Sequence, residues 1–285
     1  MKNIYIFGLN GMLGYQIANT LAKNKQFNLR GLSNSKVNEN LFASQFKIDQ
    51  KINIINFKKV KTILKKFKPN FVINCVGIVK QNSDAENLKK LYLINSNFPK
   101  NLEKASKLLK FKIIHFSTDC VFDGKKGNYT EKNKLNATDH YGISKIMGEI
   151  KSKNCLTIRT SIIGHEIKKK KQGLLEWFLM QKKSCYGFRR CFFSGLTTNE
   201  LSKFVEKVLL KKVFINGLIH VHSKKISKYL LLKKISTIYK KKIRINSSLV
   251  PQIDRSLTST KNKKFYKTPS WNKMIKEMYN EKINN

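Results

Sequence analysis

Two polar clusters have the residue types and spacing that chemistry on a carbonyl group requires. Tyr141 and Lys145 are one helical turn apart, so both side chains can share one helix face. Ser117 and Thr118 end an apolar run earlier in the chain. A tyrosine whose pKa is lowered by a nearby ammonium can protonate a carbonyl oxygen during reduction by hydride, while a hydroxyl hydrogen-bonds that oxygen. By itself this spacing can arise by chance in a lysine-rich chain, as two exposed helix residues. The order of a glycine-rich turn, a strand that ends in Ser117-Thr118 and a helix with Tyr141 and Lys145 instead favours a site for carbonyl reduction.

A glycine-rich segment near the start of the chain predicts a dinucleotide site. Gly8, Gly11 and Gly14 lie between a short apolar run and an amphipathic stretch. Glycines let the backbone approach phosphates, and the N-terminus of the following helix offers N–H donors and the positive end of its dipole. A tight strand-to-helix turn without a ligand is the alternative. The position between a clear strand and a clear helix favours the dinucleotide.

The end of the second apolar run indicates which dinucleotide is used. Enzymes that use NAD usually carry an acidic residue here for the ribose 2′-hydroxyl, whereas NADP enzymes carry a cation or small polar groups for the 2′-phosphate. The segment from Leu29 to Ser35 contains no acidic residue. We therefore predict NADPH as the cofactor, with Arg30 or Ser33 in contact with the 2′-phosphate. The alternative for Arg30 is an ordinary surface position.

The alternation of apolar runs and amphipathic stretches indicates the elements that position these residues. The predicted strands are Ile4 to Phe7, Phe27 to Leu32, Phe71 to Val76, Lys112 to Ser117 and Leu156 to Arg159. The predicted helices between them are Met12 to Lys23, Phe57 to Phe67, Asn87 to Leu109 and His140 to Lys151. Residues 1–160 are therefore expected to form an α/β domain that binds NADP(H), a Rossmann-type doubly wound parallel sheet.

Residues 161–285 are expected to form a smaller, substrate-binding lobe, because the alternation loosens after residue 160. Helical spacing recurs there over Gly173 to Lys182, Asn199 to Lys211, Ser227 to Tyr239 and Trp271 to Tyr279. The run from Gly217 to Val221 has the pattern of a strand that returns to the main sheet. The lobe is therefore not expected to fold separately.

The catalytic cluster belongs to a longer series of motifs. After the spacing Gly-x-x-Gly-x-x-Gly come Val72 to Gly77, Ile94-Asn95, Phe116 to Gly124, Gly127 to Glu131, Tyr141 to Lys145, Gly148-Glu149 and Ile158 to Ser161. In this order, over most of residues 1–165, the chain resembles the dTDP-4-dehydrorhamnose reductase family of extended short-chain dehydrogenases/reductases. The resemblance implies NADPH-dependent reduction of a nucleotide-linked 4-keto-6-deoxy sugar, most simply dTDP-4-dehydrorhamnose to dTDP-L-rhamnose, for surface polysaccharide synthesis.

The resemblance also implies roles for single residues. In such reductases, the residues that match Thr118, Tyr141 and Lys145 form the catalytic triad. The positions that would line the cofactor are Gly8, Asn10, Gly11, Met12, Leu13, Gly14, Cys75, Val76, Gly77, Asn95 and Lys145. The family often has an Asp-Val pair near the adenine, where this chain has Asn53 and Ile54, with Asp49 as a nearby substitute.

The substrate side of the site follows from the same resemblance. Thr118, Asp119 and Tyr141 would contact the sugar, and Cys120 stands where a tyrosine is more usual. The segments around Trp177 and Arg255 resemble a branch found with polysaccharide synthesis, so both residues are candidate contacts to the sugar nucleotide. The alternative for these two is a packed tryptophan and a structural ion pair.

The charge of the chain bears on its partners. The formal net charge is +41, from 58 basic and 17 acidic residues. Only six of the basic residues are arginine, and the lysines occur in every segment together with 29 asparagines. A nucleic-acid site would favour arginines gathered on one face. We therefore expect no specific nucleic acid as partner. The resemblance implies a nucleotide-linked keto-sugar as partner, and a homodimer is left open.

Cysteine, histidine and hydropathy patterns exclude other classes of function. The five cysteines have no CxxC spacing and the five histidines form no ligand set, so we predict neither a disulfide framework nor a metal site. The first apolar run is too short for a signal peptide, and no apolar stretch of 18 residues follows. We expect a cytoplasmic protein without membrane insertion.

Two other functions could use the same motifs. A nucleotide-sugar epimerase shares the glycine motif and the Tyr-x-x-x-Lys pair but keeps its nicotinamide cofactor bound. A 4,6-dehydratase needs an acid/base pair after the active-site threonine, and here Cys120 occupies one of the two places. A non-catalytic Rossmann-type binding subunit is the remaining alternative, and retention of the whole triad argues against it.

Overall fold

The computed structural model describes residues 1–81, 83–168, 171–261 and 265–281. The chain divides into two compact units. The first consists of Met1–Ser117, Thr138–Ile158 and Ser202–Leu218, and the second of Thr118–Ala137, Arg159–Leu201 and Ile219–Asn285. Each unit is therefore assembled from segments that are distant in the sequence.

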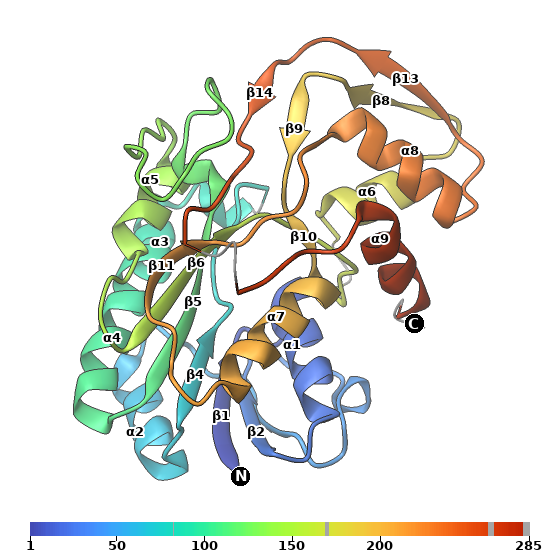
Figure 1. Ribbon diagram of the computed structural model, residues 1–285. Helices are drawn as coiled ribbons and strands as arrows, with labels where there is room; N and C mark the ends of the chain where they lie inside the picture. Colours follow the sequence, from blue (N-terminus) through green and yellow to red (C-terminus); the bar gives the residue numbers. More distant parts are fainter. Residues whose placement is uncertain (82, 169–170, 262–264, 282–285) are drawn as a thin grey trace. The chain divides into compact units, whose positions relative to one another are not determined.

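A seven-stranded sheet runs through the first unit (Figure 1). In spatial order its strands are β11 (Gly217–His220), β6 (Cys155–Thr160), β5 (Lys112–Thr118), β4 (Phe71–Asn74), β1 (Lys2–Phe7), β2 (Phe27–Leu32) and β3 (Lys47–Asp49). The pairs β1–β2, β1–β4, β2–β3 and β4–β5 are parallel. The order 3-2-1-4-5-6 confirms the predicted Rossmann-type sheet, and such sheets bind ligands at the carboxyl ends of the strands where the order reverses, here between β1 and β4.

Helices cover both faces of this sheet (Figure 1). One face carries α1 (Met12–Ala22) and α7 (Thr198–Leu210), and the other carries α2 (Phe57–Phe67), α4 (Phe98–Leu109) and α5 (His140–Gly148). Because both faces are covered, β1 is apolar on both, and its residues from Ile4 to Phe7 are fully buried. Tyr5 and Phe7 belong to the core cluster beneath α2 and α4.

Side-chain caps set the starts of two of these helices. The Asn56 side chain accepts the Lys59 N–H at the start of α2, and the Asp139 side chain accepts the Gly142 N–H at the start of α5. Such caps satisfy N–H groups that have no partner within the helix. The cap at Asp139 matters for the site, because α5 carries both Tyr141 and Lys145.

The second unit contains small sheets and short helices. The sheets among its described residues are β7 (Ile162–Ile163) with β10 (Leu196–Thr197), β12 (Ile226–Ser227) with β9 (Cys191–Phe193) and β14 (Ile253–Asp254), and β13 (Arg244–Ser248) with β8 (Ser184–Phe188). Its helices include α6 (Leu174–Met180), α8 (Lys228–Ile238) and α9 (Trp271–Asn280). No helix in the described ranges combines the length and the apolarity needed to cross a lipid bilayer.

The structure differs from the sequence-based expectations at two places and agrees with them at a third. The helix predicted over 87–109 is interrupted: α3 (Leu88–Tyr92) is followed by a π-helical turn, η3 (Leu93–Asn97), before α4 begins. The three-residue strand β3 was too short to be predicted from its pattern. The run from Gly217 was expected to return to the main sheet, and β11 confirms this at the edge beside β6.

Candidate active site

The loop between β1 and α1 forms a cradle that requires glycine at two of its positions. Gly8 has a positive φ of 87°, and a Cβ on Gly14 would lie 2.2 Å from the Gly8 carbonyl oxygen. Gly11 is the N-cap of α1 and supplies no side-chain cap, so Met12 and Leu13 begin the helix with their N–H groups directed out of its first turn. This cradle, at the switch point of the sheet, fits the diphosphate of a dinucleotide.

Small polar side chains lie beside the loop at the end of β2. The Asn10 Nδ2 atom donates to the Ser35 hydroxyl at 2.5 Å, and the buried Ser33 hydroxyl donates to the Ser35 carbonyl oxygen at 2.8 Å. Asn53 is exposed and Ile54 is buried in the segment after β3. The first unit thus places Ser33 near the loop, where the sequence predicts the adenosine end of the cofactor.

Arg30 has a partner within the sheet. Its Nε and Nη2 atoms donate to the two carboxylate oxygens of Asp49 at 2.8 and 2.6 Å, and the Tyr5 hydroxyl donates to the same carboxylate at 2.7 Å. Arg30 also lies two residues before the end of β2, at the register of Tyr5 and not at the carboxyl edge. Both facts argue against Arg30 as the contact to a 2′-phosphate, and they make Asp49 part of a structural ion pair.

The buried amide of Asn95 organises the other end of the predicted cofactor site. Its Oδ1 atom accepts the Ile78 N–H at 2.9 Å, and its Nδ2 atom donates to the Ile78 carbonyl and the Ser144 hydroxyl, both at 3.0 Å. Asn95 lies in the π-helical turn η3, a type of irregularity that is frequent at functional sites. The turn therefore connects the loop after β4 with α5.

Lys145 projects from α5 into this same region. Its side chain is only 6% exposed, and its Nζ atom donates to the Phe116 carbonyl oxygen at 2.8 Å. A Cβ on Gly77 would lie 3.5 Å from Asn95 Oδ1 and 3.8 Å from Lys145 Nζ, so these three residues converge. Cys75 and Val76 precede Gly77 in the loop, and the Val76 N–H is held by the Asn74 side chain at 3.1 Å.

Burial lowers the pKa of Lys145 to about 8, although the charge of Glu149 opposes the shift. The ammonium is therefore present below pH 8 and lost as the pH rises through that value. We expect the affinity for NADPH to fall above pH 8, by about tenfold per unit at most, since binding would then require uptake of one proton. Isothermal titration from pH 7 to 9.5 measures this, and Lys145→Met should remove the dependence; an unchanged slope in that variant would assign it to another group.

The two hydroxyls at the end of β5 have different surroundings. The Ser117 hydroxyl donates to a carboxylate oxygen of Glu149 at 2.8 Å, which ties it to the end of α5 in the first unit. Thr118, the last residue of β5, begins the second unit. Its hydroxyl donates to Asp119 Oδ1 at 3.1 Å and accepts the Cys120 N–H at 3.1 Å. Tyr141 is the second residue of α5 and is half-buried in the first unit.

Arg255 lies near Thr118 within the second unit. Its Nε atom donates to the Phe122 carbonyl oxygen at 2.8 Å, and its Nη1 atom is 4.0 Å from the Cys120 sulfur. The described residues provide no carboxylate within ion-pair distance of this guanidinium. Trp177 projects from α6 and is 38% exposed. The alternative for Arg255 was a structural ion pair. Among the described residues, Arg255 forms none.

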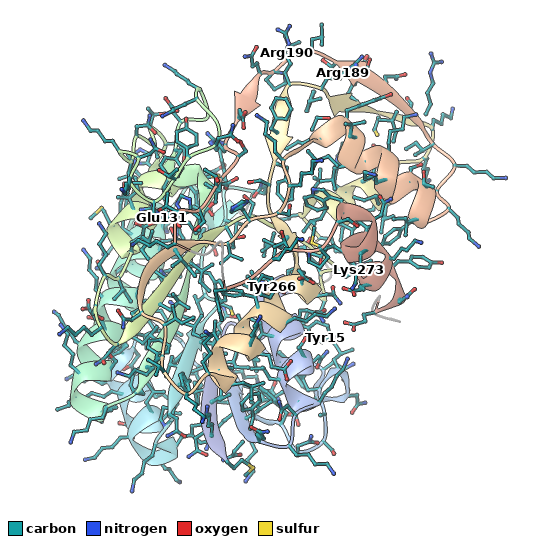
Figure 2. The ribbon with its side chains drawn as sticks, viewed as in Figure 1. Tyr15, Glu131, Arg189, Arg190, Tyr266 and Lys273 are labelled. Carbon is teal, nitrogen blue, oxygen red and sulfur yellow. The ribbon has the colours of Figure 1, made fainter. Side chains whose placement is uncertain are left out.

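Glu131, labelled in Figure 2, holds the segment that carries Arg255. Its carboxylate accepts the Ser259 hydroxyl at 2.5 Å, the Thr260 N–H at 3.0 Å and the His220 N–H at 2.9 Å. Although burial opposes the shift, these hydrogen bonds lower the pKa of Glu131 to about 2. The motif Gly127 to Glu131 was visible in the sequence, but its contact with the segment after Arg255 was not.

Sequence reasoning also missed a buried pair beneath Lys145. Asn74 Nδ2 donates to His115 Nδ1 at 3.1 Å, which places the imidazole proton on Nε2. Burial and the charge of Lys145 hold the pKa of His115 well below its usual range, so this histidine is neutral. Only the polarity of two residues inside apolar strands could have signalled the pair.

Comparisons with known proteins place the fold and the motifs in a family. The family model of the RmlD substrate binding domain matches residues 1–282. A dTDP-4-dehydrorhamnose reductase of Aggregatibacter actinomycetemcomitans is 29% identical over 150 residues, which are 52% of this chain and 46% of that protein. The chain thus spans about half the length of that curated relative.

Solved structures share the fold over nearly the whole chain. The dTDP-4-dehydrorhamnose reductase of Bacillus anthracis, solved in complex with NADP, has a TM-score of 0.78 and 20% identity and covers 99% of both chains. A UDP-N-acetylglucosamine 4-epimerase of Methanobrevibacter ruminantium has a TM-score of 0.80 and 14% identity, over 98% of this chain and 97% of that one. At these identities the likeness shows the fold alone, and it does not separate a reductase from an epimerase.

Proposed function

The chain belongs to the family of the RmlD substrate binding domain, and on that premise we propose that it reduces a nucleotide-linked 4-keto-6-deoxy sugar with NADPH. The simplest substrate is dTDP-4-dehydrorhamnose, which would give dTDP-L-rhamnose for surface polysaccharide synthesis. The observation that carries the proposal is the buried Lys145 ammonium, which lies one helical turn after Tyr141 and converges with Asn95 and Gly77.

Each residue of the proposed site has a physical task. NADPH would supply the hydride. The N–H groups at the start of α1 would hold its diphosphate, and the Lys145 ammonium would bind the ribose hydroxyls and lower the pKa of Tyr141. Tyr141 would donate a proton to the carbonyl oxygen, while the hydroxyl of Thr118 turns from Asp119 to hydrogen-bond that oxygen.

The proposed substrate contacts come from the second unit. Arg255 offers a guanidinium without a carboxylate partner among the described residues, which suits an anionic group of a sugar nucleotide. Asp119 follows Thr118 directly and accepts its hydroxyl, so it would adjust when substrate binds. The partly exposed indole of Trp177 offers an apolar face to the sugar or base.

The decisive assay is NADPH oxidation with a panel of dTDP-, UDP- and GDP-linked 4-keto-6-deoxy sugars. Stoichiometric consumption of NADPH with at least one of them supports the reductase. Release of bound nicotinamide on denaturation, with sugar interconversion and no net NADPH consumption, would instead identify an epimerase. Binding of NADPH without turnover of any sugar would identify a non-catalytic subunit.

We expect NADPH to bind at least about tenfold more tightly than NADH, because one charged hydrogen bond to the 2′-phosphate contributes about that much affinity. Fluorescence titration at low and high salt measures the ratio without the general attraction of a +41 chain for anions. Ser35→Asp is the matched variant, because it places a carboxylate at an exposed position beside Asn10 and should reduce the preference. Equal affinities for the two cofactors in the unmodified protein would refute the assignment.

A further inference from the structure

A partly buried polar cluster in the second unit, His165 with Glu176, Lys171 and Tyr239, joins α6 to the end of α8. His165 lies between two partners: its Nδ1 atom is 2.9 Å from a carboxylate oxygen of Glu176, and its Nε2 atom is 2.9 Å from the Tyr239 hydroxyl. Glu176 belongs to α6, and Tyr239 is the C-cap residue of α8. One imidazole therefore connects two helices that are far apart in the sequence.

Glu176 binds both of the basic side chains of the cluster, His165 and Lys171. Its second carboxylate oxygen forms an ion pair with Lys171 at 3.2 Å, and its side chain is 7% exposed. Burial alone would raise the pKa of Glu176, but the hydrogen bonds from His165 and Lys171 lower it below its usual value. The carboxylate is therefore charged and can only accept, so the imidazole must donate to it from Nδ1.

His165 can form both of its hydrogen bonds, to Glu176 and to Tyr239, whether or not the imidazole is protonated. In neutral His165, Nδ1–H donates to Glu176 and Nε2 accepts the Tyr239 hydroxyl proton. In the imidazolium, both nitrogens donate and the Tyr239 oxygen accepts. Either form of the imidazole therefore connects Glu176 of α6 with Tyr239 of α8.

Helix α6 is too short to be stable without contacts to the rest of the second unit. It has seven residues, fewer than an isolated helix needs, and its N-cap Gly173 supplies no side-chain cap. Leu175 and Phe178 anchor one side of it by burial. Trp177 follows Glu176 directly and is the exposed residue of that turn, so a rotation of α6 about the Glu176 anchor would move the indole.

We propose that His165 is a positioning residue, which through Glu176 fixes the orientation in which Trp177 contacts the sugar nucleotide. The inference rests on the proposed function for its substrate, but the positioning itself can be measured without substrate. The histidines show no ligand pattern in the sequence, and the cluster gives one of them a task outside the proposed triad.

The test is fluorine NMR of the full chain labelled with 5-fluorotryptophan. The chain has two tryptophans, and Trp271 is buried with its Nε1 atom donating to the Lys224 carbonyl oxygen at 2.7 Å, so its signal is an internal control for the fold. His165→Ala should shift and change the linewidth of the Trp177 signal while leaving the Trp271 signal in place. In His165→Asn the amide can still donate to Glu176, so the Trp177 signal should return part of the way to its position in the unmodified protein.

Kinetics complete the test. His165→Ala should raise KM for the keto-sugar nucleotide about tenfold, with kcat and the affinity for NADPH nearly unchanged, since a misplaced contact weakens binding and not proton transfer. His222→Ala is the matched control, because the imidazole of His222 contacts the carbonyl of the neighbouring Ser223. An unchanged Trp177 signal in His165→Ala would overturn the positioning role, and so would an altered signal with unchanged KM. Failure of the unmodified protein to turn over any sugar would defeat the proposed function instead, and the NMR result would still stand.

Discussion

Tyr141→Phe should lower turnover by about 10³-fold while NADPH still binds, because the variant removes the proposed proton donor and keeps the ring and the ammonium of Lys145. A general acid contributes most when the carbonyl oxygen gains negative charge, so the loss should fall on kcat and not on KM. Steady-state NADPH oxidation with the best sugar of the panel measures the first effect, and isothermal titration with NADPH measures the second.

Lys145→Met is the matched partner of that variant, and it should behave differently. The buried ammonium would serve both the tyrosine and the nicotinamide ribose, so its removal should weaken cofactor affinity and turnover together. Both titrations need low and high salt, because a chain of net charge +41 attracts anions without specific contacts. Near-normal turnover of Tyr141→Phe with every accepted sugar would mean that the Tyr-x-x-x-Lys spacing is a coincidence of a lysine-rich chain.

Thr118→Val should lower kcat by about 10²-fold with little change in NADPH affinity, since a hydroxyl that polarises the carbonyl matters most as the oxyanion develops. The same substitution removes the acceptor for the Cys120 N–H, a cap that is worth about 1 kcal/mol of stability. Thr118→Ser is therefore the control, because it keeps both the cap and the donor.

Thermal unfolding of the threonine variants separates the two consequences. A Thr118→Val protein that remains folded at the assay temperature and yet turns over slowly supports the catalytic role. An increase confined to KM would make Thr118 a contact to bound substrate and no more.

The regular parts of the fold could be predicted because local pattern and burial agree there. The strand before the glycine loop is apolar on both faces, and helices lie on both sides of it. The spacing of Tyr141 and Lys145 predicted one helix face, and both residues lie on α5. The motifs were informative because each depends on only a few neighbouring residues.

The remaining features depend on contacts between distant segments. The π-helical turn around Asn95 cannot be predicted from periodicity, because the extra residue is stabilised by Ile78 and Ser144, which come from other elements. In the same way, nothing around Arg30 in the sequence shows that Asp49 is its partner across β2 and β3. The tie from His165 to Glu176 and Tyr239 joins residues that no local pattern connects.

Segments of the two units alternate along the chain, and this order affects folding during synthesis on the ribosome. The first unit receives its edge strand β11 and helix α7 from residues that emerge well after β6. Until then, the edge of β6 has unpaired backbone groups, and such an edge invites association with other chains. A nascent chain halted between residues 160 and 217 should therefore be the form most dependent on chaperones.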